Sequence, residues 1–244
     1  HPLTLKEVLK GLQDVLILYL GSLPRPQRFG FPSLQRIGVA GGFRNGITST
    51  GVDYDLVFPS LTAVFGEITV TFPIRSLSFP VLSSIRPQST SQYGLRMTSV
   101  SSIVSLSMPS LVHITGGGNG IVVTYASSLV SLIVPMLQNT SGLVVQQNPA
   151  LVNAAFPSLE QIDGFLQISD NPSWLNISFP SLKRLVTSLI QIRRANLANA
   201  SFPLLNFVQG SIFEMQDIVC SGLEFASLQA LDTSSMTVTN CTFS

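Results

Sequence analysis

The chain has 244 residues, of which 45% are hydrophobic and only 10% are charged. This composition excludes a charge-driven disordered chain, which needs low hydrophobicity and a high net charge. Thirteen basic and twelve acidic residues leave a net charge of +1, so no strong field attracts a phosphate backbone and we expect no nucleic-acid partner.

Residues 1–22 are expected to form an N-terminal cap helix and a first strand. Thr4 and Glu7 have the spacing of a capping box. Aliphatic residues follow at helical intervals: Leu5, Val8, Leu9 and Leu12. A short amphipathic helix would cover the apolar end of the first coil. No basic segment precedes an apolar segment and a cleavage site, so we expect that any targeting peptide was removed or never present.

Residues 23–219 are dominated by an internal repeat. A Phe-Pro-Ser-Leu tetrapeptide or a variant of it begins at nine positions about 23 residues apart: Phe31, Phe58, Phe79, Met108, Val134, Phe156, Phe179, Phe202 and Phe225. One coil of this length cannot bury its own apolar face, whereas stacked coils share a continuous core. The sequence therefore predicts one all-β domain over residues 1–244, a solenoid of about nine to ten coils.

The Phe-Pro pair is expected at a corner of each coil, because proline lacks the backbone donor that a central strand needs. The seven phenylalanine anchors are predicted to point inward and to stack along the solenoid axis: Phe31, Phe58, Phe79, Phe156, Phe179, Phe202 and Phe225. They are the predicted repeat-core residues.

Two segments between the anchors, 142–149 and 164–172, are expected to share one conformation, a short alternating strand followed by an Asn-Pro turn. Asn148 and Asn171 would then occupy equivalent turns. Beyond these units the alternation shifts at Leu189, which either a one-residue bulge or burial on both faces explains. The longer spacings around 41–46 and 86–89 predict loops.

The last segment, 220–244, is interpreted as a C-terminal coil and cap. The spacing between Cys220 and Cys241 is close to one period, and adjacent coils would bring them near each other. We therefore expect a disulfide between them.

Four Asn-x-Ser/Thr sequons are candidates for N-glycosylation: Asn139, Asn176, Asn199 and Asn240. Chance accounts for about two sequons in a chain of this composition, so the excess is modest. Asn176 and Asn199 are one period apart and occupy the same coil position, so both should face solvent together. Glycosylation is favoured at these two.

No catalytic, cofactor-binding or metal-binding site is predicted. The two histidines, His1 and His113, and the two cysteines form no metal-binding or nucleophile motif. The run Gly116–Gly120 precedes a predicted strand rather than a helix, so it indicates a turn and not a phosphate loop. We expect the protein not to be an enzyme.

Carboxylates are the remaining candidates, because carbohydrate-active solenoids use clustered acids. The pairs considered are Asp53 with Asp55, Asp163 with Asp170, and Glu214 with Asp217. We expect no neighbouring coil to supply an aligned third acid or a basic partner beside Asp163 and Asp170. The basic pairs 183–184 and 193–194 could bind anionic glycans, although exposure to solvent is the simpler account.

Taken together, the opening segment from Leu5 to Leu20 and the repeat from Phe156 to Phe179 resemble the receptor L-domain superfamily. This superfamily includes the ligand-binding domains of the insulin and epidermal growth factor receptors and cell-wall glycoproteins of fungi. The resemblance covers nearly the whole chain and implies a right-handed β-helix related to leucine-rich repeats and displayed outside the cell. The few cysteines and the lack of a cysteine-rich module favour the wall or surface glycoprotein branch.

The main hypothesis is thus a non-catalytic extracellular glycoprotein, a structural or recognition element of a cell wall, matrix or surface appendage. Residues 97–159 carry no Asp, Glu, Lys or Arg. Their polar coil faces suit contact with an extracellular protein or glycan, and a glycan-coated surface explains them equally well. No membrane span is predicted here, although a lipid anchor or flanking region is compatible. A receptor-type ectodomain and a carbohydrate-active β-helix enzyme are the alternatives.

Overall fold

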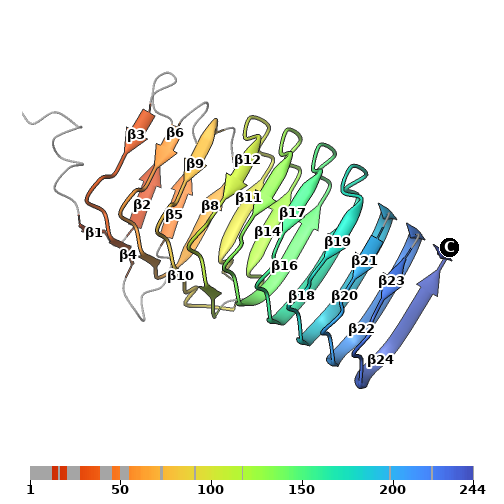
Figure 1. Cartoon of the computed structure of the whole chain (residues 1–244). Helices are drawn as coiled ribbons and strands as arrows, with labels where there is room; N and C mark the ends of the chain where they lie inside the picture. Colours follow the sequence, from red (N-terminus) through yellow and green to blue (C-terminus); the bar gives the residue numbers. More distant parts are fainter. Residues whose placement is uncertain are drawn as a thin grey trace, which may run out of the picture.

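The computed structural model describes residues 13–15, 17–20, 28–38, 46–49, 55–71, 74–90, 92–116, 118–197, 199–220 and 222–243. Within these residues the chain consists of strands and turns, and the strands are parallel in stacked coils. About eight turns follow one another in an elongated β-solenoid (Figure 1). The predicted fold class is confirmed. Nine to ten coils were expected, but nine anchors delimit only eight intervals.

Two columns of strands form the main sheet in the first half of the chain. The first column contains β1 (Asp14–Val15), β4 (Arg36–Ile37), β7 (Ala63–Val64), β10 (Ser84–Ile85) and β13 (His113–Ile114). The second contains β2 (Ile17–Leu20), β5 (Gly46–Ser49), β8 (Glu67–Val70), β11 (Leu95–Thr98) and β14 (Ile121–Thr124). The first strand expected within residues 1–22 is therefore present, whereas the cap helix expected over residues 4–12 lies outside the described residues.

The two columns merge in the second half of the chain. The merged strands are β16 (Asn139–Gln146), β18 (Gln161–Ser169), β20 (Arg184–Leu197), β22 (Phe207–Cys220) and β24 (Ala230–Thr239), with β25 (Thr242–Phe243) beside the end of β22. They merge because the connection between the first and the second column becomes shorter along the chain. A loop containing Pro87 separates β10 from β11, as expected for 86–89, whereas only Ser141 separates the two paired parts of β16. The other predicted loop, at 41–46, lies mostly outside the described residues.

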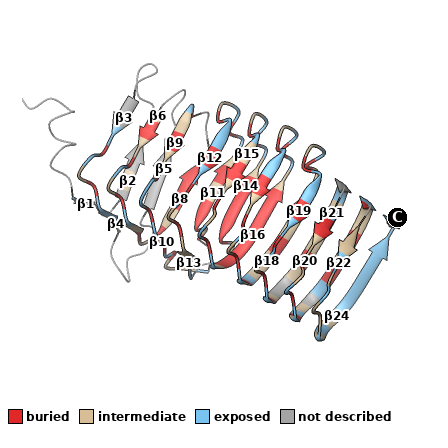
Figure 2. Cartoon of the chain, in the orientation of Figure 1, coloured by how far each residue is buried: buried red, intermediate tan, exposed pale blue. Residues whose placement is uncertain are grey.

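A third column closes each coil and precedes the anchor of the next. It contains three short sheets: β3 (Arg28–Gly30), β6 (Asp55–Val57) and β9 (Ser76–Ser78); β12 (Ser105–Ser107), β15 (Ser131–Ile133) and β17 (Asn153–Ala155); β19 (Asn176–Ser178), β21 (Asn199–Ser201) and β23 (Leu223–Glu224). The apolar core lies between this column and the main sheet (Figure 2).

Each anchor forms a β-turn, as the Phe-Pro pattern predicts. The backbone N–H of Leu182 donates to the carbonyl of Phe179 over 3.2 Å, and Leu159 donates to Phe156 in the same way. Proline at the second position of the turn presets the backbone angle that such a turn requires. The tetrapeptide is therefore a corner.

The phenylalanine anchors stack inside the solenoid in two groups. Ring centroids are 4.9 and 5.1 Å apart along Phe31, Phe58 and Phe79. They are 5.9, 5.5 and 5.1 Å apart along Phe156, Phe179, Phe202 and Phe225. Met108 and Val134, both fully buried, fill the two intervening positions. The predicted stack is confirmed, with an aliphatic interruption between its halves.

The shift of alternation after residue 164 is a bulge. Leu166 pairs with Leu143, but the ladder register changes between Thr140 and Gly142, so β18 contains one extra residue. In β20 another residue is inserted, and Ile190 pairs with Leu166. After the shift in β20, Ile190 and Ile192 are buried whereas Leu189 is only partly buried, so this strand is not buried on both faces.

Candidate functional site

The uncharged stretch 97–159 contributes a regular surface beside the third column. Four aliphatic residues, each four positions before an anchor, are exposed in successive coils: Val104, Val130, Val152 and Leu175. Their exposed fractions are 55%, 40%, 56% and 44%, so none belongs to the core. We call this row the aliphatic stripe.

Backbone hydrogen bonds between adjacent coils align the residues of the aliphatic stripe in one row. The N–H of Val130 donates to the carbonyl of Val104 over 2.8 Å, and the N–H of Val152 donates to Val130 over 3.0 Å. Leu175 follows Val152 by one period of the repeat. Adjacent side chains are therefore about 4.8 Å apart, the ordinary spacing of paired strands.

A row of small polar residues runs beside the aliphatic stripe. Ser105, Ser131 and Asn153 pair in register on β12, β15 and β17, and Asn176 begins β19. None of these side chains is charged, so a partner could cover both rows without desolvating an ion. The two rows together are called the uncharged face.

The aliphatic stripe was missed in the sequence, although a signal was present. Each stripe residue directly follows a buried side chain, as Val152 follows Leu151, and such a pair resembles ordinary core. Alignment of the coils on their anchors shows an aliphatic residue four positions before the anchor, in addition to the aliphatic residues that fill the core. An additional aliphatic position of this kind indicates an exposed stripe.

The sequons differ in their surroundings. Asn176 and Asn199 are exposed and pair in register, with Nδ2 of Asn199 3.4 Å from Oδ1 of Asn176. Asn240 is exposed and donates to Asp217 over 2.7 Å. Asn139 is partly buried, with Nδ2 3.3 Å from Nδ1 of His113. The first three therefore offer more room for a glycan, and occupancy stays a prediction.

The expected disulfide between Cys220 and Cys241 is wrong, because both thiols are free in the structure. The register explains why. Cys220 pairs with Phe243, beyond Cys241 in the chain, so the two cysteines are diagonal neighbours rather than directly opposite. A diagonal pair of this kind is about 7–8 Å apart, too far for a bridge without backbone movement. The two cysteines are fewer residues apart in the chain than residues of β22 and β24 that pair directly, such as Phe213 and Met236.

The candidate carboxylates that the structure describes each contact another side chain. Asp55 accepts from Ser76 over 2.7 Å, and Asp163 accepts from Gln161 over 2.6 Å. Asp217 accepts from the sequon Asn240 described above. Asp53 lies outside the described residues. In the part of the chain that the structure describes, no cluster of three or more His, Cys, Asp or Glu could hold a metal ion.

The basic pairs also contact residues of adjacent coils. Arg193 contacts Glu214 with an N–O distance of 2.6 Å, and this hydrogen bond, aided by one from Gln191, lowers the pKa of the Glu214 carboxyl. Lys183 pairs with Glu160 at 3.2 Å. Arg184 lies over the ring of Phe207. Arg194 binds Asp170, so the expectation that no neighbouring coil gives this acid a basic partner is wrong.

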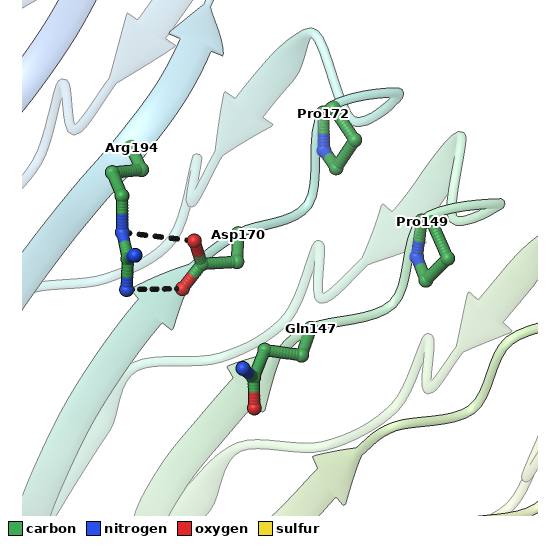
Figure 3. Close-up of a pocket in the computed structure, with 5 residues that line it drawn as sticks. All are labelled: Gln147, Pro149, Asp170, Pro172 and Arg194. Carbon is green, nitrogen blue, oxygen red and sulfur yellow. Dashed lines mark hydrogen bonds and ion pairs between the residues drawn. The ribbon is translucent and has the colours of Figure 1, made fainter.

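A shallow groove of about 400 Å³ lies at the corner that follows the main sheet (Figure 3). It is lined by Gln147, Pro149, Asp170, Pro172 and Arg194. Arg194 and Asp170 form a two-point ion pair at 2.9 Å across it, so their charges are already compensated. The groove offers two proline rings and one amide, which provide a surface for contact rather than groups for chemistry.

The described residues of the glycine run form bends that lead into a strand rather than into a helix, as the predicted turn requires. Gly120 has a φ of +51°, and β14 begins at the next residue. A Cβ at this position would collide with the carbonyl oxygen of Gly142 in the adjacent coil. Glycine is required here for close approach between coils rather than for binding phosphate.

The described residues contain no helix long and apolar enough to cross a membrane. Comparison with protein-family models, curated proteins and solved structures gives no significant match. The likeness to receptor L-domains therefore rests on the sequence pattern alone, and the structure establishes the class of protein: a parallel β-solenoid.

Proposed function

We propose that the protein is a non-catalytic, extracellular solenoid glycoprotein that acts as a structural or recognition element of a cell wall, matrix or surface appendage. The observation that carries the proposal is the aliphatic stripe beside a row of uncharged polar residues. This face binds an uncharged extracellular partner, protein or glycan.

The energetics favour contact through this face. Each stripe side chain keeps 40% or more of its surface exposed, although the same residue types are buried elsewhere in each coil. Covering apolar surface yields about 25 cal/mol per Å². The neighbouring serine and asparagine side chains supply hydrogen-bond donors and acceptors that give such a contact direction.

The contacts of the acids and bases support a non-catalytic role. Glu214 and Asp170 are held by Arg193 and Arg194 of adjacent strands, and Glu160 by Lys183. These pairs tie one coil to the next. Asn176 and Asn199 lie at the end of the uncharged face, where glycans would mark it as extracellular.

Binding to neutral polysaccharides, namely insoluble β-glucan, cellulose and chitin, and to purified matrix proteins tests the proposal. The test variant is Val130→Lys with Val152→Lys, which places two charges in the stripe without touching the core. Val81→Lys, at an aliphatic position 40% exposed on another corner, is the matched control. We expect the wild type and the control to bind one of these probes, and the double variant to lose about tenfold or more in affinity.

Three results would contradict the proposal. The first is equal binding by the wild type and the double variant, and the second is no binding to any probe. The third is release of soluble products from a polysaccharide that Asp163→Asn abolishes, because that result would assign the protein to the enzymes.

A further inference from the structure

The groove at the corner after the main sheet combines apolar rings with polar groups (Figure 3). Pro149 and Pro172 occupy equivalent positions of adjacent coils, and both are exposed. Gln147 and Asp170 also occupy equivalent positions, two residues before each proline. Each of these coils therefore contributes one ring and one polar side chain to the groove, at the spacing of paired strands.

The ion pair in the groove keeps part of its hydrogen-bonding capacity. Nε and Nη2 of Arg194 donate to the two carboxylate oxygens of Asp170, each over 2.9 Å. A guanidinium carries five N–H donors and a carboxylate about four lone-pair sites, so about three donors and about two acceptor sites are not used by the pair. The Arg194 side chain is 62% exposed and that of Asp170 is 23% exposed, so a ligand can reach both groups.

Two further side chains extend this polar surface along the solenoid axis. The amide of Gln147 lines the groove and adds donors and an acceptor. Tyr125 occupies the same position one coil earlier and is 55% exposed. Its backbone N–H donates to the carbonyl of Gln146 over 3.2 Å, which places Tyr125 beside Gln147. Apolar rings with a few fixed polar groups between them are typical of small-molecule sites.

Two observations favour a neutral saccharide over an ionic ligand or a peptide. Asp170 compensates the charge of Arg194, so an ionic ligand meets no unpaired counter-charge. The backbone N–H groups of Tyr125, Gln147 and Asp170 all donate to adjacent coils, so these residues offer an extended peptide no row of main-chain donors. Each hydroxyl of a sugar both donates and accepts, which matches donors and acceptors that are held side by side.

We infer that this groove binds a neutral saccharide chain that lies along the solenoid axis. Sugar hydroxyls contact Gln147 and the pair of Asp170 and Arg194, and the apolar faces of the sugar rings lie on the two prolines and Tyr125. The groove is distinct from the uncharged face, because the turn that ends at Leu151 separates them. The inference deepens the proposed function by naming a glycan as the partner class, and it rests on that function for the extracellular setting.

Isothermal titration calorimetry with soluble hexasaccharides of β-linked glucose and of N-acetylglucosamine tests this inference. We expect the wild type to bind at least one of them. Gln147→Ala removes the amide, and Arg194→Lys keeps the charge but loses the planar fork. Each should weaken binding by about fivefold, the effect of one lost hydrogen bond. Gln138→Ala is the matched control, because this exposed glutamine precedes β16 whereas Gln147 follows it, and it should bind like the wild type.

Asp170→Asn provides a second test, through a change of selectivity. The variant leaves Arg194 without its counter-charge. Asparagine tolerates the left-handed backbone that Asp170 adopts, so we expect the fold to be retained. This variant should gain binding to a hexasaccharide of galacturonic acid, which the wild type should not bind.

Four results would overturn the inference. They are a wild type that binds neither neutral hexasaccharide, a Gln147→Ala variant that binds like the wild type, an Asp170→Asn variant that does not gain the acidic ligand, and displacement of the saccharide by a proline-rich peptide.

The variant Val130→Lys with Val152→Lys separates this inference from the proposed function. Its groove is intact, so it should bind the soluble hexasaccharides like the wild type even where it loses the probes of the uncharged face. Loss of hexasaccharide binding in this variant would assign the saccharide to the uncharged face and overturn the role of the groove. Loss in the groove variants alone would support the groove whatever the outcome for the aliphatic stripe.

Discussion

The side-chain amide of Asn148 lies against that of Asn171 in the next coil, with Nδ2 of Asn148 donating to Oδ1 of Asn171 over 3.1 Å. Nδ2 of Asn171 donates to the carbonyl of Val145 over 2.8 Å, and Nδ2 of Asn148 donates to that of Val123 over 3.1 Å. Oδ1 of Asn148 accepts the N–H of Ala126. Both asparagines are almost fully buried, so these bonds satisfy backbone groups that water does not reach.

Replacing Asn148 with alanine should destabilise the protein strongly. The change leaves the N–H of Ala126 and the carbonyl of Val123 without these partners, and each buried unsatisfied group costs about 1–3 kcal/mol. We expect the free energy of unfolding, measured by urea denaturation, to fall by about 3 kcal/mol. Asn153→Ala on the exposed third column is the control, and an equal loss there would refute the role of the asparagine link.

The bulge in β18 makes a second prediction, through Gly164. A Cβ at this position would overlap the backbone carbonyl of Ser141, and a backbone atom cannot move aside as a flexible side chain can. Gly164→Ala is expected to cost about 3 kcal/mol through overpacking. Gly30→Ala, where no atom lies within 4 Å of the added Cβ, should change stability by less than about 0.5 kcal/mol. Thermal and urea unfolding of the two variants would show the difference, and equal midpoints would contradict the packing argument.

Local constraints explain what could be predicted from the sequence. Pro at the second position of eight of the nine anchors fixes the corner, and a phenylalanine beside it has no place except the core. The turns at Asn148 and Asn171 were predictable in the same way, since an Asn-Pro pair at a constant period marks a repeated turn.

The remaining features depend on register between coils, which the period alone does not fix. A one-residue insertion such as Gly164 is invisible until the ladder is known. The cysteine spacing was close to one period, yet Cys220 pairs with Phe243 and not with Cys241. The aliphatic stripe was missed because Val152 beside Leu151 has the composition of core. Residue type shows that a side chain is apolar, but only the coil geometry shows which way it points.

A left-handed backbone position recurs once per coil, directly after the strands of the main sheet or, at Arg194 and Asp217, inside β20 and β22, and it makes a third prediction. Among the described residues, seven that are not glycine have positive φ: Ser99, Tyr125, Gln147, Asp170, Arg194, Asp217 and Asn240. This conformation costs about 1–2 kcal/mol for a residue with a Cβ, and glycine adopts it freely. Gln147→Gly should raise the free energy of unfolding by about 0.5–1 kcal/mol.

The neighbouring residue provides the control for this prediction. Gln146 ends β16, where glycine weakens a strand, so Gln146→Gly should lower stability by about 0.5–1 kcal/mol. Opposite signs for adjacent substitutions are the expected outcome of urea denaturation. Loss of stability in both variants would show that the positive φ stores no strain.

The ion pair between Arg193 and Glu214 predicts a dependence of stability on pH. The hydrogen bond from Arg193 lowers the pKa of Glu214 in the folded state from its ordinary value of 4.5. A carboxyl whose folded pKa is depressed contributes stability above its unfolded pKa, and this contribution is lost as pH falls through the folded pKa. Glu214→Gln should therefore lower stability at neutral pH and flatten the loss of stability below about pH 4.5. Glu160→Gln, at a half-exposed pair, is the surface control for denaturation at stepped pH.

The last prediction concerns the sequons Asn176 and Asn199. They pair in register on adjacent strands, and their side-chain amides are 3.4 Å apart. Adjacent strands are about 4.8 Å apart, less than the width of one sugar chain with its hydration. Two glycans would collide at their first residues, so in material from a glycosylating host we expect one glycan at this pair and not two. Mass analysis of the peptides that contain Asn176 and Asn199 measures this, and Asn176→Gln should raise occupancy at Asn199. Two glycans on one chain, or no response to Asn176→Gln, would show that the paired strands leave more room than their register implies.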